Sequence, residues 1–269
     1  MYIKRSMEKS SPTCKSGGER MRRCAVIIPA LNPPESLVEY VRTLLLRGVA
    51  QVIVVNDGSD GSTAEVFRRL SRLERCTVLT HSVNRGKGRA LKTAFAYVLR
   101  EELGDWSGVV TADADGQHHP DDVCHVAAVL GRGEDAVILG IRDFSHSHVP
   151  WRSQLGNRLT RWLIRWLFDT KIEDTQTGLR GIPKQHLPWM LELKGERFEY
   201  EMNMLLNVIR KRIRIQQVPI RTLYFHRNTG SHYRAIVDSL RIFVRIVSGL
   251  MASFRSGKKA MPSKGRKRP

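Results

Sequence analysis

Short apolar runs alternate with segments of helical periodicity along the first half of the chain, and this alternation restricts the fold more than any other feature of the sequence. The apolar runs are residues 24–29, 51–55, 77–80, 109–112 and 136–140. Strands that are apolar throughout and alternate with helices are typical of a parallel sheet covered by helices on both faces. We therefore predict an α/β fold.

A cluster of polar residues follows each apolar run, at the point where the predicted strand ends. The clusters come after Ile28, Val55, Thr80, Thr111 and Leu139. The carboxyl ends of parallel strands meet at one edge of an open sheet, and ligands bind outside that edge. The repeated coincidence of strand end and polar cluster predicts a ligand site there.

The cluster after Thr111 contains carboxylates at Asp113 and Asp115 and an amide at Gln117. Side chains two residues apart in an extended segment point the same way, so these three groups can line one side of the strand end. Oxygen ligands of this kind suit Mg²⁺ or Mn²⁺. Pro120 suits the first turn of a following helix. The alternative is a polar loop whose acids serve only as turn and cap residues, because the D-x-D pattern is short and common.

Beyond residue 143 the pattern is less regular. Trp162 and Trp166 interleave with arginines at helical spacing, and we interpret them as packing residues rather than as a lipid groove. Residues 214–220 are typical of an edge strand, because Pro219 cannot donate to a sheet ladder. The last predicted helix, residues 233–254, is amphipathic. It either covers the core or lies on an anionic bilayer, and the pattern leaves both open.

The formal net charge of +19 favours an anionic partner such as a phosphorylated substrate, an anionic membrane surface or nucleic acid. Part of the excess lies in two basic tails, residues 1–22 and 256–269, which we predict to be disordered on either side of one domain, residues 23–255. The sequence shows neither a signal-peptide core nor an apolar run long enough to cross a bilayer. The four cysteines lack paired spacing, so we expect no disulfides and a cytoplasmic location, with peripheral contact to the cytoplasmic face of the membrane.

Eight motifs occur in order at residues 28–32, 54–59, 84–88, 113–117, 174–178, 198–201, 218–220 and 230–233. Together they resemble the family 2 glycosyltransferases, and most closely the branch of dolichyl-phosphate mannosyltransferases and polyprenyl-phosphate glycosyltransferases. The resemblance implies a GT-A fold, which is a Rossmann-like, mostly parallel sheet flanked by helices, here with a C-terminal amphipathic helix. Two positions depart from the family: Pro33-Pro34 replaces its usual acidic pair, and Asn56 stands where it often has Asp.

The resemblance implies an inverting, metal-dependent transfer of a hexose from a nucleoside-diphosphate sugar to a polyprenyl (dolichyl or undecaprenyl) phosphate. The alternative within the family is transfer to a saccharide hydroxyl in cell-envelope polysaccharide synthesis. The implied partners are the sugar nucleotide, the lipid-phosphate acceptor and an anionic membrane surface, with a separate membrane protein as a further candidate. A sugar nucleotidyltransferase and a non-enzymatic nucleic-acid binder are less favoured, and we expect no specific nucleic acid partner.

The resemblance also assigns roles to residues of this sequence. Metal ligands for Mg²⁺ or Mn²⁺ are Asp113, Asp115 and Gln117. Substrate-binding residues are Pro29, Ala30, Glu35, Asp57, Lys87, Asp113 and Arg227. Residues placed at the chemistry are Arg142, Arg152 and Asp115, with the two arginines stabilising phosphate charge. If the acceptor were a hydroxyl, a general base would be needed, and Asp174 or Glu199 would be the candidates.

Overall fold

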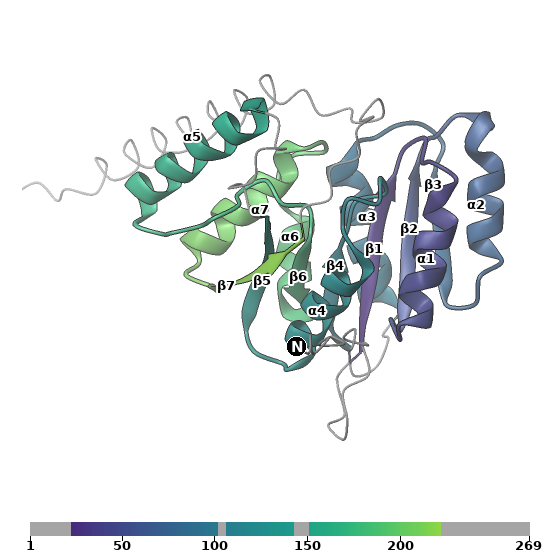
Figure 1. Cartoon of the computed structure of the whole chain (residues 1–269), viewed down its shortest axis with the longest axis horizontal. Coiled ribbons are helices and arrows are strands. Elements are labelled where there is room, and N and C mark those ends of the chain that lie inside the picture. Colours follow the sequence, from purple (N-terminus) through teal and green to yellow (C-terminus); the bar gives the residue numbers. More distant parts are fainter. Residues whose placement is uncertain (1–22, 102–105, 143–150, 222–269) are drawn as a thin grey trace, which may run out of the picture.

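The computed structural model describes residues 23–101, 106–142 and 151–221 of the chain (Figure 1). Arg227, the predicted tails and the predicted helix 233–254 lie outside these residues, so the expectations about them remain predictions. Arg152 lies on a described helix, but its side chain is not described.

Seven strands form one sheet in the order β3-β2-β1-β4-β6-β5-β7. The strands are β1 (Arg23–Ala30), β2 (Gln51–Asp57), β3 (Cys76–His81), β4 (Trp106–Thr111), β5 (Ala136–Arg142), β6 (Arg180–Pro183) and β7 (Arg214–Ile220). All strand pairs are parallel except those of β6, which is antiparallel to both β4 and β5. The mostly parallel α/β sheet is confirmed, and β7 is the edge strand that Pro219 predicted.

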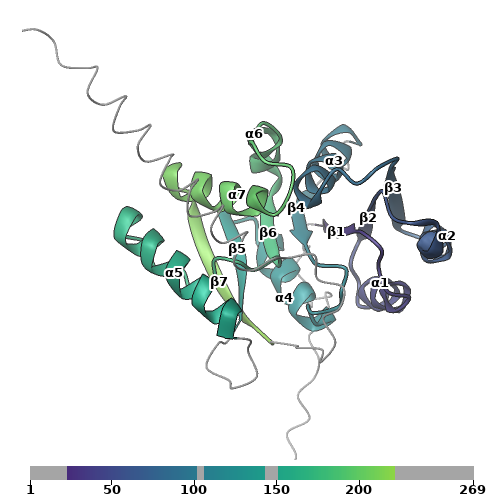
Figure 2. The ribbon, with the colours of Figure 1, turned by 90° about the horizontal axis from the view of Figure 1, so that it is seen from above.

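Helices cover both faces of the sheet (Figure 2). The helices are α1 (Ser36–Leu46), α2 (Ala64–Ser71), α3 (Lys87–Arg100), α4 (Pro120–Gly131), α5 (Trp151–Phe168), α6 (Leu187–Leu191) and α7 (Glu199–Arg210), with short 3-10 helices at Gly61–Thr63 and Lys184–His186. One core cluster joins the sheet to α1, α2 and α4, and a second joins it to α3, α5, α6 and α7. Within β1, Val26 and Ile28 belong to the first core and Ala25 and Ile27 to the second. Both faces of this strand are therefore buried, which explains its unbroken apolar sequence.

Three local expectations fail. Residues 62–65 have the sequence of a capping box, but no box forms, because the N-cap of α2 is Thr63 and it makes no side-chain cap hydrogen bond. Trp162 and Trp166 are exposed rather than packed, with 61% and 71% of their surface accessible. Cys24 and Cys76 are free thiols, but Cys124 takes part in a disulfide, so the expectation of no disulfides is wrong.

One helix boundary confirms the sequence pattern closely. Helix α4 begins at Pro120, and the side chain of His119 caps it by accepting a hydrogen bond from the backbone N–H of Asp121. No helix in the described part of the chain has the length and apolar character needed to cross a membrane.

Candidate functional site

The carboxyl edge of the parallel strands gathers the polar loops that the sequence pattern predicted there. The loop after β1 and the loop after β2 are joined by Asn32. Its backbone N–H donates to Ser59 Oγ (2.9 Å), its side-chain Nδ2 donates to Asp60 Oδ2 (2.8 Å), and its Oδ1 accepts from the Asp60 N–H (2.8 Å). Asn32 has a φ of 48°, a left-handed conformation that asparagine tolerates better than most residues. These contacts set the relative positions of the first two strand ends.

Asp57 ends β2 and holds the loop that precedes α3. Its Oδ2 accepts the Gly86 N–H (2.7 Å), and its Oδ1 accepts the Arg85 N–H (2.9 Å) and lies 2.7 Å from Nδ1 of His81. An ionised carboxylate has about four acceptor positions, so three are occupied. Asp57 thus orders the Arg85–Lys87 turn. One acceptor position of its carboxylate is left for a nucleoside, and that contact remains a prediction.

Asp113 is the centre of the site. Its Oδ1 accepts from the Lys87 ammonium (2.7 Å), and its Oδ2 lies 3.1 Å from Nε2 of His118. Burial alone would raise the pKa of Asp113, but the charge of Lys87 and the hydrogen bond from His118 hold it well below its usual range. Asp113 is therefore ionised at neutral pH. His118 is itself buried.

Asp115 follows Asp113 in the same turn, where its residue surface is exposed but its carboxyl group is partly desolvated. Burial of its carboxyl group, and then the negative charge of Asp113, raise the pKa of Asp115. Its Oδ1 accepts the backbone N–H of Gln117 (3.1 Å), which closes the turn between these two residues.

Two carboxylates that repel one another, with an amide in the same turn, fit a hard divalent cation such as Mg²⁺ or Mn²⁺. Among the described residues no group of three His, Cys, Asp or Glu side chains is arranged to hold a metal ion, so the sequence-based assignment of Gln117 as the third ligand remains a prediction.

Gly178 explains how Asp113 fits into the site. A Cβ added to Gly178 would lie 2.4 Å from Oδ2 and 2.9 Å from Cγ of Asp113. The hydroxyl of Thr111 donates to the Gly178 carbonyl (2.7 Å) and holds this backbone against the end of β4. The absence of a side chain at Gly178 thus leaves the space that the Asp113 carboxylate occupies.

Lys87 is the first residue of α3, and it has a partner that the sequence pattern did not reveal. Its ammonium lies 2.8 Å from Oε2 of Glu201, in the first turn of α7, as well as 2.7 Å from Asp113. Burial alone would lower the pKa of Lys87, but the two carboxylates raise it above its ordinary value. The resulting Asp113–Lys87–Glu201 triad places a fixed positive charge at the edge of the site.

Arg142 ends β5 and pairs with Asp174, whose side chain is fully buried. The guanidinium donates through Nε to Oδ2 (2.7 Å) and through Nη2 to Oδ1 (3.1 Å), a bidentate geometry that orients it firmly.

Arg180 connects the two halves of the site. Burial lowers the pKa of this residue, and the charges of Glu201, Asp174 and Asp113 oppose that shift. Its guanidinium donates to the carbonyls of Thr177 and Glu201, so it also fixes the backbone of both neighbouring segments. Neither Arg180 nor Glu201 was among the residues predicted from the sequence.

The residues predicted to shape the nucleoside pocket lie together at the end of β1. Pro29 is half-buried, Ala30 is buried, and Glu35 is exposed at the start of α1, where its side chain caps no backbone group. Their contacts with a nucleoside remain a prediction.

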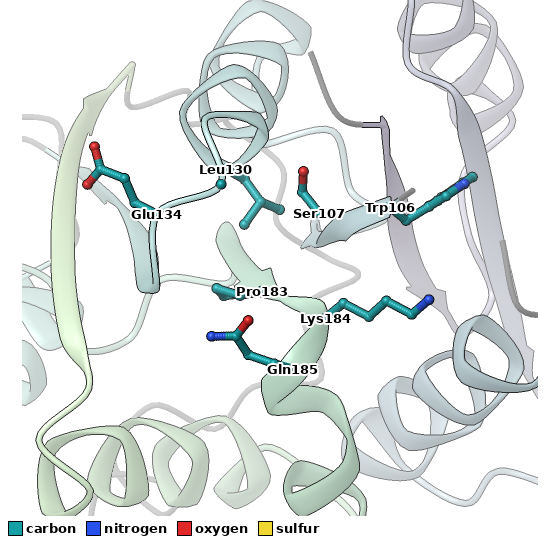
Figure 3. Close-up of a pocket in the computed structure, with 8 residues that line it drawn as sticks. Trp106, Ser107, Leu130, Glu134, Pro183, Lys184 and Gln185 are labelled. Atoms are coloured by element: carbon teal, nitrogen blue, oxygen red, sulfur yellow. The ribbon is translucent and has the colours of Figure 1, made fainter. Parts of the chain in front are cut away.

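A cavity of about 330 Å³ lies among strands β4 and β6 and the segment before β5, and Figure 3 shows the side chains that line it. Trp106 and Ser107 at the start of β4 and Pro183 at the end of the antiparallel β6 line it, together with Leu130, Gly133, Glu134, Lys184 and Gln185. These positions mark the amino edge of the parallel strands. The cavity is therefore separate from the Asp113 cluster.

Comparison with known proteins identifies the family of the chain. The sequence model of "Glycosyl transferase family 2" matches residues 25–187. A UDP-N-acetylglucosamine–dolichyl-phosphate N-acetylglucosaminyltransferase of Methanococcus voltae is 26% identical over 241 residues, covering 82% of this chain and 94% of that protein. A polyprenol monophosphomannose synthase of Mycolicibacterium smegmatis is 27% identical, covering 79% and 83%.

Solved structures support the fold. The glucosyl-3-phosphoglycerate synthase of Mycobacterium tuberculosis, crystallised with Mn²⁺, UDP and glucosyl-3-phosphoglycerate, superposes with a TM-score of 0.63 at 18% identity, covering 84% of this chain and 79% of that one. The match to the family extends from β1 through the Asp113 cluster and β6. The chain therefore belongs to glycosyl transferase family 2 and is a glycosyltransferase with a GT-A fold.

Proposed function

We propose that this enzyme transfers a hexose, with inversion, from a nucleoside-diphosphate sugar to a polyprenyl phosphate. The observation that carries the proposal is the pairing, at one sheet edge, of an acidic pair suited to a cation with two oriented cationic groups, Lys87 and Arg142. The named relatives that act on dolichyl or polyprenol phosphates support the choice of acceptor.

The donor would lie over Asp113, Asp115 and Gln117. A divalent cation held by these residues would neutralise charge on the pyrophosphate of the leaving nucleotide. Lys87, at the amino end of α3, adds a second positive charge where a helix N-terminus already favours anions. Asp57 orders the turn that carries Lys87, and Pro29, Ala30 and Glu35 would border the nucleoside.

The acceptor would meet Arg142. Because Asp174 fixes the guanidinium through Nε and one Nη, the group has a defined orientation, and a guanidinium suits phosphate oxygens. We assign Arg152 and Arg227 to the same acceptor phosphate. An acceptor phosphate is ionised at neutral pH, so alignment and charge stabilisation suffice for the attack on the anomeric carbon.

The surroundings of Asp174 favour a phosphate acceptor over a saccharide hydroxyl. Asp174 is fully buried and both of its oxygens pair with Arg142. A hydroxyl acceptor needs a general base with a free oxygen at the site, and Asp174 has none. Glu199, the other candidate base, accepts the backbone N–H of Glu196 through Oε1 (3.3 Å).

The exposed face of α5 supports contact with a membrane that carries the acceptor. The rings of Trp162 and Trp166 stack 6.2 Å apart with an interplanar angle of 4°, and Arg158 and Arg165 are exposed on the same side of the helix. Tryptophan and arginine together favour the interface of an anionic bilayer. On the other side, Asn157 Oδ1 accepts the Thr175 N–H (3.1 Å), which ties α5 to the loop that carries Asp174.

Transfer activity tests the reaction. The full chain would be incubated with a panel of UDP-, GDP- and dTDP-sugars and polyprenyl phosphate in detergent, with Mn²⁺, with Mg²⁺ or with EDTA. We expect a lipid-linked sugar from one donor, formed with either metal and abolished by EDTA. No product from any donor with either metal would contradict the proposal, and product only with a saccharide acceptor would favour the alternative reaction.

Sedimentation with vesicles tests the membrane surface. Phosphatidylcholine vesicles with and without phosphatidylglycerol would be compared, using Trp162→Ala/Trp166→Ala against the control Leu46→Ala, which removes an exposed apolar side chain from α1. We expect the tryptophan variant to lose most of its binding to anionic vesicles and the control to keep it. Equal binding by both variants would remove α5 from the membrane contact.

A further inference from the structure

Lys87 and a divalent cation need the same oxygen atoms. In the structure the Lys87 ammonium lies 2.7 Å from Oδ1 of Asp113, which is one of the two predicted carboxylate ligands. An ammonium at this distance supplies positive charge where a cation would supply it. A cation that binds Asp113 must therefore compete with Lys87, and Lys87 must find another partner when the cation arrives.

Glu201 is placed to be that partner. Its Oε2 already lies 2.8 Å from the Lys87 ammonium. Its Oε1 is buried and has no hydrogen-bond partner among the described residues. A buried carboxylate oxygen without a donor is costly, and an ammonium carries three donors. Glu201 can therefore accept a second hydrogen bond from Lys87 once Asp113 no longer does.

The position of Glu201 is fixed by its surroundings. The residue is 9% exposed, and its backbone carbonyl accepts from the buried guanidinium of Arg180. The neighbouring Tyr200 is fully buried and donates its hydroxyl to the Met190 carbonyl (2.8 Å). The start of α7 thus holds the carboxylate against Lys87 rather than letting it swing into solvent.

We propose that Glu201 is a positioning residue for cation loading: it takes over Lys87 when a divalent cation binds Asp113, and so keeps the lysine beside the donor's pyrophosphate. This inference rests on the proposed function for the identity of the site. It assigns Glu201 no contact with the substrate. Lys87 competes with the cation when it pairs with Asp113 and assists the donor when it pairs with Glu201 alone.

The test is a double-mutant cycle on Mn²⁺ binding by the full chain without any sugar nucleotide, followed by the EPR signal of free Mn²⁺. Lys87→Met should tighten Mn²⁺ binding about fivefold, because Asp113 loses its competitor, and Glu201→Gln should weaken it about fivefold, because displaced Lys87 loses its carboxylate. In the Lys87→Met background, Glu201→Gln should change the affinity less than about twofold. Glu192→Gln and Lys194→Met, which alter exposed side chains of the same types, are the controls.

The cycle separates this handover from simple charge effects. If Glu201 acts only through its own negative charge, its substitution weakens Mn²⁺ binding equally with and without Lys87, and that additivity would overturn the proposal. Tighter or unchanged binding in Glu201→Gln alone would overturn it as well. If Lys87→Met fails to fold, as judged by circular dichroism, Lys87→Gln takes its place in the cycle. Absence of Mn²⁺ binding by the wild type would overturn both this proposal and the assignment of the cation site. The transfer assay with and without EDTA tests the proposed reaction independently of this cycle.

Discussion

Replacing Gly178 with alanine should disable the cation site without altering any residue that contacts the cation. The added methyl group would lie 2.4 Å from Oδ2 of Asp113, whereas real Cβ contacts are essentially never shorter than 3.0 Å. The carboxylate must move by about 0.6 Å or more, the difference between these two distances. It is not a free side chain, because Lys87 and His118 hold its two oxygens.

Two magnitudes follow from this displacement. Overpacking of a well-filled site typically costs about 1–3 kcal/mol in the free energy of unfolding. A misplacement of about 1 Å at a reacting centre costs about a hundredfold in rate. Gly178→Ala should therefore remain folded, with a modestly lower melting temperature, and lose about two orders of magnitude in sugar transfer.

The assay compares Gly178→Ala with Gly61→Ala, since an added Cβ at Gly61 meets nothing within 4 Å. Melting temperature, Mn²⁺ affinity and transfer rate would be measured for both variants and for the wild type. The reasoning would be refuted by a Gly178→Ala enzyme that binds Mn²⁺ and transfers sugar as well as Gly61→Ala does. It would also fail if activity fell only in proportion to the fraction of unfolded protein.

Three further results are expected. The pKa of Asp115 is raised in the folded state, so just above the ordinary carboxyl pKa the folded protein binds more protons than the unfolded chain. The stability of the metal-free wild type should therefore fall as the pH rises through that range. A pH series of melting temperatures should show this fall in the wild type and not in Asp115→Asn. Arg142→Lys replaces the bidentate pair with Asp174 by a single contact, so transfer to polyprenyl phosphate should drop about a hundredfold while Mn²⁺ affinity stays unchanged, and an equal loss of both would contradict the acceptor assignment. Asp57→Asn turns an amide N–H toward backbone donors, including that of Gly86, and should lower the free energy of unfolding by about 1–3 kcal/mol in urea titrations; an unchanged value would show that the turn is held by other contacts.

Local sequence pattern was sufficient for the parallel part of the fold. The runs that form β1, β2, β4 and β5 are apolar because both faces of these strands are buried. A few consecutive apolar residues are enough to indicate such a strand. The antiparallel β6 was missed because Arg180–Pro183 is only four residues long and its burial depends on β4 and β5 on either side. Arg180 is charged yet buried. Its burial is possible because residues distant in the sequence, such as Glu201, surround it, and the adjacent sequence does not indicate this.

Within the candidate site, too, residues close together in the sequence could be proposed from the pattern, whereas contacts between distant segments could not. Asp113, Asp115 and Gln117 could be proposed as metal ligands from the sequence because they belong to one turn, and that role remains a prediction. The partnership of Lys87 with Glu201 was not, because it joins the start of α3 to the start of α7 across the sheet edge.

The tryptophans of α5 show the same limit. Their helical spacing establishes that Trp162 and Trp166 share a side of the helix, but not which side faces the core. That orientation is decided by the buried Asn157, Thr160 and Ile164 on the other side. Only tertiary packing could reveal that the tryptophans face outward.

The central claim is that Asp113 and Asp115 hold a divalent cation that binds the donor's pyrophosphate. It is tested most directly by the melting temperature of the full chain with nucleoside-diphosphate sugars, with and without Mn²⁺. A donor at about one hundred times its dissociation constant should stabilise the folded state by about 2.7 kcal/mol, and the stabilisation should require Mn²⁺ and disappear in Asp115→Ala. A donor-induced rise in melting temperature of equal size without Mn²⁺, or in Asp115→Ala with it, would contradict the account.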